Sequence, residues 1–254
     1  MTHSYFWLSD QQFDRLAPLL PQDTRGKPRV DDRRVISGIV HVLKSGCRWV
    51  DAPEVYGPRK TLYNRFVRWA AKGIWTDIFK ALADAGGPPS DVMIDSSAVR
   101  AHRCASGGKG GKRSQAIGRS RGGRTTKIHA LTDQFGRPLR LHLHLTGGNA
   151  SDCRGGEPLL EALPAEVLVH ADKGYDTDRV RQIIENQGAA PNIPPKANRR
   201  WKNCFSPFLY RDRNAIERMF GRLKDFRRIA TRYDRLAVNF LAAVQIAAFV
   251  SYWL

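Results

Sequence analysis

The chain has 254 residues, of which 42% are hydrophobic, enough to bury the core of one large domain or of one domain with a small accessory unit. That content excludes a chain that is disordered throughout. The 42 Lys and Arg residues against 24 Asp and Glu give a net charge of +18. Such an excess of cations indicates a polyanionic partner, because basic groups release condensed counterions from phosphates.

Neither membrane insertion nor export is expected. The most apolar run, residues 237–254, is at the short limit for spanning a bilayer and contains Asn239, Gln245 and Ser251, so it is predicted to be a buried helix. The N-terminus lacks the basic and then apolar pattern of a secretory signal. The four cysteines are scattered without a CxxC pair, which argues against a zinc site or a disulfide framework. We therefore expect a cytoplasmic protein with reduced thiols.

Residues 1–86 predict a small helical unit. The first helix, residues 9–20, begins at Ser9 as N-cap with a glutamine three residues later, and its apolar residues recur at helical spacing. A turn-rich basic stretch at 21–29 leads to a second helix, which is predicted to end at Gly46.

A third helix, over about residues 60–72, carries much of the basic charge of this unit. The basic residues expected to contact DNA are Arg59, Lys60, Arg65 and Arg68. Three short helices with a basic last helix are typical of a helix-turn-helix DNA reader. A small helical bundle with a solvated basic face would give the same pattern, so both interpretations stay open.

The glycine and proline run at 86–89 is the best candidate for a linker, and the pattern changes after it. A short strand is predicted at 91–95. Residues 105–124 contain seven Gly and six Lys or Arg without an acidic residue, so we expect a mobile basic loop that cannot pack. Two alternating strands, at 125–132 and 138–146, then form a hairpin.

Helices and strands alternate through the rest of the chain. The predicted elements are a helix at 152–163, a strand at 167–171, a helix at 176–187, a strand at 190–194 and helices at about 212–230 and 237–253. This order predicts an α/β sheet covered by helices, in a main domain over residues 90–254.

Two carboxylates lie at the ends of predicted strands. Asp95 ends the first strand of the main domain, and Asp172 directly follows the strand at 167–171. Side chains at neighbouring strand ends converge at the edge of a sheet, where α/β proteins have their sites. Two close carboxylates raise each other's pKa unless a cation lies between them, and Mg²⁺ prefers oxygen ligands. Metal ions held in this way support in-line displacement at phosphorus.

The helix near residue 217 offers a third carboxylate. At about 100° per residue, four side chains fall within an arc of about 60°. They are Tyr210, Arg213, Glu217 and Lys224. Glu217 would bind metal, while Arg213 and Lys224 would hold phosphates. Tyr210 would contact a phosphate or stack on a base. A surface helix whose Glu217 pairs with Arg213 has the same spacing, so the spacing alone does not decide between them.

The run from Tyr210 through Arg213 and Glu217 to Lys224 is similar, in residue type and in spacing, to the Tyr-Arg-Glu-Lys signature of the bacterial DDE insertion-sequence transposases. A signature of four residues at fixed spacing is more specific than a lone carboxylate.

Other segments resemble the same family in the same order. IDSSAVRAH around Asp95 resembles the segment of the first aspartate, and HADKGYDTD around Asp172 resembles that of the second. Residues 122–152 and 29–66 are similar to the insertion-sequence-five-type branch. The resemblance thus covers nearly the whole chain.

The resemblance implies an RNase-H-like mixed sheet flanked by helices, with an N-terminal DNA-binding region. Asp95, Asp172 and Glu217 would hold two Mg²⁺ ions, for which Mn²⁺ would substitute. Water would cut a phosphodiester at each terminal inverted repeat of a mobile element, and the freed 3′-hydroxyl would attack target DNA. Double-stranded DNA would be the partner of a homodimer assembled on it, at the bacterial nucleoid.

Two further features bear on the site. Lys127 and His129 face the same way on a predicted strand, and we expect them to line the site, with Lys127 as a phosphate contact. The interval between Asp172 and Glu217 is too short for the large inserted domain of some relatives. This short interval argues against a second-strand cut through a DNA hairpin, without deciding the route.

Two alternative functions remain at this point. A DNA-binding protein without catalysis explains the charge but not the three carboxylates. An RNase-H-like nuclease with another role explains the carboxylates, but explains the helical N-terminus less naturally.

Overall fold

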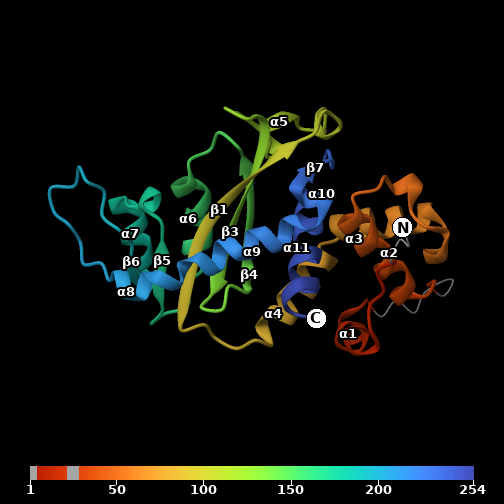
Figure 1. Ribbon diagram of the computed structural model, residues 1–254, viewed down its shortest axis with the longest axis horizontal. Helices are drawn as coiled ribbons and strands as arrows, with labels where there is room; N and C mark the ends of the chain where they lie inside the picture. Colours follow the sequence, from red (N-terminus) through yellow and green to blue (C-terminus); the bar gives the residue numbers. More distant parts are fainter. Residues whose placement is uncertain (1–4, 22–28) are drawn as a thin grey trace.

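The structure is a computed structural model that describes residues 5–21 and 29–254 (Figure 1). Its helices are α1 (Asp10–Leu16), α2 (Asp32–Ser45), α3 (Arg59–Ala71), α4 (Ile74–Asp84), α5 (Gly111–Ser114), α6 (Asp152–Leu160), α7 (Asp178–Asn186), α8 (Pro207–Tyr210), α9 (Asn214–Lys224), α10 (Arg227–Ala230) and α11 (Ala237–Tyr252). Its strands are β1 (Asp91–Ala101), β2 (Gly118–Ser120), β3 (Gly123–Asp133), β4 (Pro138–Gly147), β5 (Leu168–Ala171), β6 (Ala190–Asn192) and β7 (Thr231–Arg232).

Strand β1 lies at the centre of a mixed sheet. On one side it pairs antiparallel with β3, which pairs antiparallel with β4. On the other side it pairs parallel with β5, which pairs parallel with β6 through the crossover helix α7. The short strands β2 and β7 pair with β3 and with the far end of β1. This strand order is that of the RNase-H-like fold, so the predicted fold class is confirmed.

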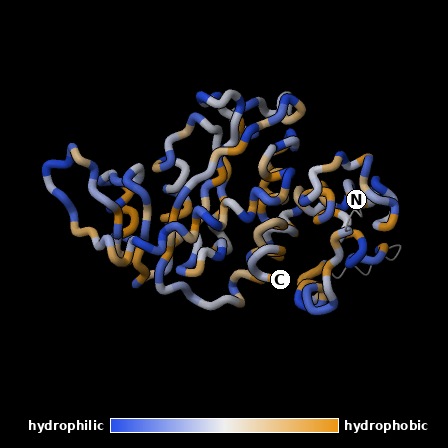
Figure 2. Tube along the Cα trace, in the orientation of Figure 1, coloured by the Kyte–Doolittle hydropathy of each residue, from blue (hydrophilic) through white to orange (hydrophobic). Residues whose placement is uncertain are grey.

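The two faces of the sheet are buried by different helices. Val92 and Ile94 of β1 belong to a hydrophobic cluster with residues of α6 and α7. Met93 and Val99, which alternate with them, belong to a second cluster with residues of α9 and α11. In Figure 1, α9 crosses in front of β1 and β3. Hydrophobic segments gather along the strands in Figure 2, whereas the loop between β6 and α8 is largely hydrophilic.

The N-terminal helices share the second cluster. Helix α4 packs against β4 and α11, and α2 packs against α10. Trp75, Phe79 and Phe249 are fully buried in this cluster, and Thr76 Oγ1 donates to Gln245 Oε1 at 3.0 Å. The predicted linker at 86–89 does lie between α4 and β1, but α4 itself was not predicted. The helical region is therefore joined to the sheet by a continuous apolar core.

Local signals in the N-terminal region gave correct elements. Ser9 caps α1 in a capping box, and α2 ends at Gly46 with φ of 78°, in the left-handed region that favours glycine. The third predicted helix is α3. The turn predicted at 21–29 lies mostly outside the described residues.

The expectation that the segment 105–124 cannot pack is wrong. It contains α5 and β2, and β2 pairs with β3. Ile117, its one large aliphatic side chain, is buried in a small cluster with Ala101 and Ala105. This cluster packs the segment although its overall composition is polar and basic. Its mobility in the absence of DNA stays a prediction.

Strand β1 is longer than predicted. The expected strand stopped at Asp95, but pairing with β3 continues to Arg100 opposite Thr125. None of the helices in the described part of the chain has the length and apolar character needed to cross a membrane.

Candidate active site

Asp95, inside β1, and Asp172, directly after β5, lie side by side at the edge of the sheet that the carboxyl end of β5 forms. In the parallel register of β1 and β5, Ile94 is opposite Ala171, and each aspartate is the next residue. Both side chains therefore point to the face that α9 covers, because neighbours in a strand alternate between faces. The two carboxylates that the sequence predicted at strand ends are brought together.

Helix α9 brings the next residues of the predicted set to this edge. Arg213 donates from Nη1 to Asp95 Oδ2 at 3.0 Å and from Nη2 to Glu217 Oε1 at 2.7 Å. Its guanidinium carbon lies 5.6 Å from the centroid of the Tyr210 ring, a cation–π distance. Helix α8, a short 3₁₀ turn and α9 follow one another without a gap from Pro207 to Lys224. The predicted single helix is thus interrupted, but its side chains still converge.

The pairing of Glu217 with Arg213 is the contact that the surface-helix alternative required. Arg213 is only 13% exposed, however, and its other branch binds Asp95 across 118 positions of sequence. The pair is therefore part of a tertiary site, and α9 is not simply a solvated surface helix.

Lys224 extends the site along β1. Its Nζ donates to Ser97 Oγ at 2.6 Å, and Ser97 lies on the same face as Asp95, two residues further along the strand. Burial lowers the pKa of Lys224. The ammonium group is thus held over β1 at the end of α9, at a position two residues from Asp95 along the strand.

Burial sets the electrostatics of the aspartate pair. It raises the pKa of Asp95, an effect that the Ser96 N–H and the Arg213 guanidinium oppose and that the neighbouring Asp172 reinforces. Asp172 Oδ1 is buried and has no hydrogen-bond partner among residues 5–21 and 29–254. A buried carboxylate oxygen that lacks a donor is costly, so this edge favours a bound cation.

The residues at this edge fit a hard divalent cation. Within residues 5–21 and 29–254, no three His, Cys, Asp or Glu side chains stand close enough to share a metal ion, and Arg213 lies between Asp95 and Glu217. The donor set itself is all carboxylate oxygen, which magnesium-like ions prefer. Asp172 offers an oxygen that has no partner within the described residues, and Glu217 is 59% exposed and bonded to Arg213.

Lys127 and His129 do not line this edge, contrary to the prediction. They lie opposite Ala98 and Ser96, which puts them on the α6 face of the sheet. Lys127 Nζ donates to Asp152 Oδ1 at 2.8 Å, and the buried His129 lies 2.7 Å from Thr146 Oγ1. Strand alternation was applied correctly within β3, but the register against β1 was not available from the sequence.

Two residues near the carboxylates, Ser96 and Tyr175, were not singled out from the sequence. Ser96 donates its N–H to Asp95 Oδ1 at 2.7 Å, and its hydroxyl donates to Asp152. Tyr175 is buried, its hydroxyl has no partner within the described residues, and burial raises its pKa. Ser96 lies in the segment IDSSAVRAH around Asp95, and Tyr175 lies in the segment HADKGYDTD around Asp172. Membership of these segments was the signal in the sequence that could have identified them.

The predicted DNA contacts of the N-terminal region divide into two groups. Arg59, Lys60 and Arg68 are exposed on α3. Arg65 instead pairs with Asp32, and its guanidinium lies 4.7 Å from the Trp69 ring centroid. Arg65 therefore fixes α3 against α2, and the exposed residues remain the candidates for binding.

Two family profiles match the chain. The profile described as "Transposase DDE domain" matches residues 86–254, about two thirds of the chain. The chain belongs to the DDE transposase family. The profile described as "Putative transposase of IS4/5 family" matches residues 8–79. This DDE transposase is therefore an enzyme that acts on DNA, and its family is generally dependent on a divalent metal.

Similar proteins carry the same function in their names. A "Putative transposase for insertion sequence element IS6501" of Brucella ovis is 36% identical over 124 residues, 48% of this chain and 94% of the relative. A "Transposase for insertion sequence element IS1106" of Neisseria meningitidis serogroup B is 35% identical over 102 residues, 38% of this chain and 35% of the relative.

A solved piggyBac transposase synaptic complex with hairpin DNA is 10% identical, with a TM-score of 0.48, over 94% of this chain and 70% of that one.

Proposed function

We propose that this DDE transposase cuts DNA at the terminal inverted repeats of its element and joins the freed 3′-hydroxyl to target DNA. The observation that carries the proposal is Arg213, which links Glu217 of α9 to Asp95 beside Asp172. That connection supports a site in which carboxylates from three separate elements act together.

Asp95, Asp172 and Glu217 would hold two Mg²⁺ ions, with Mn²⁺ as a substitute. Bound there, the ions would activate the attacking oxygen and stabilise the leaving one. Arg213 and Lys224 are placed to hold the charged backbone of the cut strand, Arg213 by its planar fork and Lys224 as a point charge. Tyr210 orients Arg213 by stacking and is a candidate contact to a phosphate or a base.

The partner of the reaction would be double-stranded DNA, both at the element ends and at the target. We assign residues 1–86 to DNA binding, with Arg59, Lys60 and Arg68 of α3 as contacts, and residues 90–254 to catalysis. Because two element ends must meet in the reaction, we expect a homodimer assembled on DNA. Its place of action would be the bacterial nucleoid.

The test is cleavage and strand transfer on a duplex that carries the terminal repeat flanking the gene, with Mg²⁺. Glu217→Gln removes a carboxylate charge at constant size, so it should bind the duplex and fail to cut or join it. Glu185→Gln, at an exposed position of α7, is the matched control and should retain wild-type cleavage.

Each other outcome points to a different function. Binding without cleavage by all three proteins, with Mn²⁺ also present, would indicate a DNA-binding protein without catalysis. If the wild type cleaves RNA–DNA hybrids of any sequence as fast as it cleaves the repeat duplex, the protein is a nuclease with another role. Equal cutting by wild type and Glu217→Gln would remove Glu217 from the triad.

A further inference from the structure

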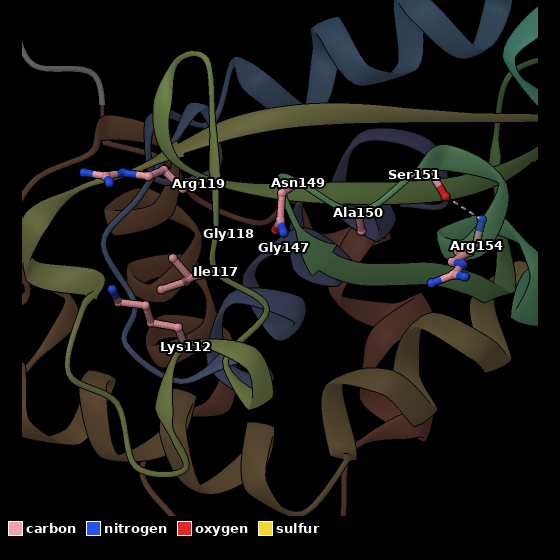
Figure 3. Close-up of a pocket in the computed structure, with 9 residues that line it drawn as sticks. All are labelled: Lys112, Ile117, Gly118, Arg119, Gly147, Asn149, Ala150, Ser151 and Arg154. Atoms are coloured by element: carbon pink, nitrogen blue, oxygen red, sulfur yellow. Dashed lines mark hydrogen bonds between the residues drawn. The ribbon is translucent and has the colours of Figure 1, made fainter.

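A cavity of about 840 Å³ lies on the α6 side of the sheet, on the face opposite to the side chains of Asp95 and Asp172. Figure 3 shows Lys112 and Arg119 on one side of it, Arg154 on the other, and Asn149 between them. None of the residues that line it is acidic. The active-site proposal makes no use of this cavity.

The cations of the cavity are available to a ligand. Lys112, Arg119 and Arg154 are exposed, and none of them has an ion-pair partner in the described part of the chain. The one carboxylate nearby, that of Asp152, is turned to Lys127 and Ser96 in the sheet. Like charges gathered without a counter-charge repel one another, so they favour an anionic occupant.

The floor of the cavity is built by close backbone packing. A Cβ on Gly118 would lie 1.9 Å from Asn149 Oδ1, and one on Gly147 would lie 3.0 Å from Gly118 N. Glycines at these positions let β2 approach the end of β4, which leaves the hollow open to solvent above them. The first turn of α6 borders it, where Ser151 Oγ accepts from Arg154 N at 3.4 Å.

The shape and lining favour a polyanionic chain over a small molecule. Pockets for small ligands are lined mainly by apolar and aromatic side chains, but this lining has one large apolar residue, Ile117, and no aromatic one. A second cavity of about 560 Å³ shares Lys112 and Arg119 and adds Arg124. The two cavities therefore form one groove with cations spaced along it. Such a row of cations matches the row of phosphates along a nucleic-acid strand.

The groove leads away from the aspartate pair. At one end, Cys153 next to Arg154 donates to Gly174 O at 3.1 Å, two residues after Asp172. At the other end, Gly118 pairs with Thr125, which lies opposite Arg100, five residues and about 17 Å along β1 from Asp95. That span corresponds to about five nucleotides of duplex.

We propose that Lys112, Arg119 and Arg154 form a second backbone-binding site, which holds the phosphodiester chain of duplex DNA beyond the triad, on the other face of the sheet. The site rests on the proposed function for its orientation, but its own residues contact no triad member.

The test compares two double variants that each lower the net charge by two. Lys112→Gln/Arg154→Gln removes cations from both sides of the cavity, and Arg179→Gln/Arg222→Gln removes exposed cations of α7 and α9. Each phosphate contact adds about 0.9 to the slope of log affinity against log salt. The slope for the terminal-repeat duplex should therefore fall by about 1.8 in the first variant and stay at the wild-type value in the second.

Phosphate ethylation locates the contact. In the wild type, ethylation of one or two phosphates within about five nucleotides of the cut position should weaken binding. The Lys112→Gln/Arg154→Gln variant should lose that interference and retain the interference at the cut position, because the triad is intact.

Equal slopes in the two double variants would overturn the proposal, since general charge would then explain both. Binding of inorganic phosphate to the cavity with no change in the duplex slope would indicate a free-anion site and would also overturn it. A wild type that cuts the repeat, combined with an unchanged slope in the cavity variant, refutes this site alone. A wild type that neither binds nor cuts the repeat refutes the proposed function as well.

Discussion

Arg213 connects α9 to the sheet edge by binding two carboxylates with two separate nitrogens. A planar guanidinium makes such contacts in two directions, whereas an ammonium is a single point charge. Its position over the Tyr210 ring adds a third constraint, on the orientation of the guanidinium plane. At the residue scale, therefore, the candidate site depends on the shape of this side chain as much as on its charge.

We expect Arg213→Lys to lower the cleavage rate by about 100-fold, because small misplacements of reacting groups cost that much. The charge is kept, so the slope of affinity against salt should stay within experimental error of wild type. Arg218→Lys is the control, since Arg218 bonds to Asn214 on the outer side of α9. Cleavage by Arg213→Lys at the wild-type rate would show that the fork does not position the carboxylates.

His129 shows how a buried side chain on the far face of the sheet sets the pH range of stability. Burial lowers its pKa from 6.5 to about 4, so the folded state favours the neutral ring. The contribution of the neutral His129 ring to the free energy of unfolding is fully present above pH 6.5, and it is lost as the pH falls toward 4. The expected loss is about 3 kcal/mol at ~1.4 kcal/mol per pKa unit.

Urea unfolding between pH 7 and pH 4 tests this dependence. His129→Gln should be less stable at pH 7 and should show a pH slope shallower than wild type by about 3 kcal/mol over the interval. Burial also lowers the pKa of His144 and His170, so both proteins keep some slope. A curve for His129→Gln that runs parallel to the wild-type curve would contradict the assignment.

At the element scale, the sequence predicted those parts that local interactions determine. The cap at Ser9 and the left-handed Gly46 act within one turn, so α1 and α2 were predicted correctly. The extension of β1 beyond Asp95 was not predictable from its mixed polar residues, because it depends on pairing with β3. Likewise, strand ends indicated that Asp95 and Asp172 converge, but the Arg213–Asp95 contact depends on tertiary packing.

The same substitution, Gly to Ala, is expected to have opposite effects on stability at two helix glycines. A Cβ on Gly155 of α6 would lie 2.1 Å from the His129 ring, so Gly155→Ala should destabilise the fold by more than about 2 kcal/mol. Nothing lies within 4 Å of a Cβ on Gly221 of α9, so Gly221→Ala should stabilise it by about 0.5–1 kcal/mol. Chemical denaturation measures both; a stable Gly155→Ala would mean that α6 can move off the sheet.

At the scale of the whole molecule, one apolar cluster joins the N-terminal helices to the sheet. It contains Phe79 of α4, Val99 of β1, Ile128 of β3 and Phe249 of α11. A second cluster on the far face holds β5, α6 and α7. The helical region is thus packed firmly against the sheet, and the proposed DNA-binding residues would present bound DNA at a fixed position to the proposed catalytic ones.

The shared cluster predicts that α2–α4 and the central strands unfold together. Phe79→Ala removes a fully buried ring and should lower the free energy of opening by about 3–5 kcal/mol, both in peptides of α4 and in peptides of β1 and β3. Native-state hydrogen exchange read by mass spectrometry measures each peptide separately. Phe208→Ala, where the ring is 72% exposed, should leave protection unchanged. If protection fell in α4 alone while β1 and β3 kept theirs, the helices would be an independent unit, and DNA would have to be transferred to the carboxylates by a movable arm.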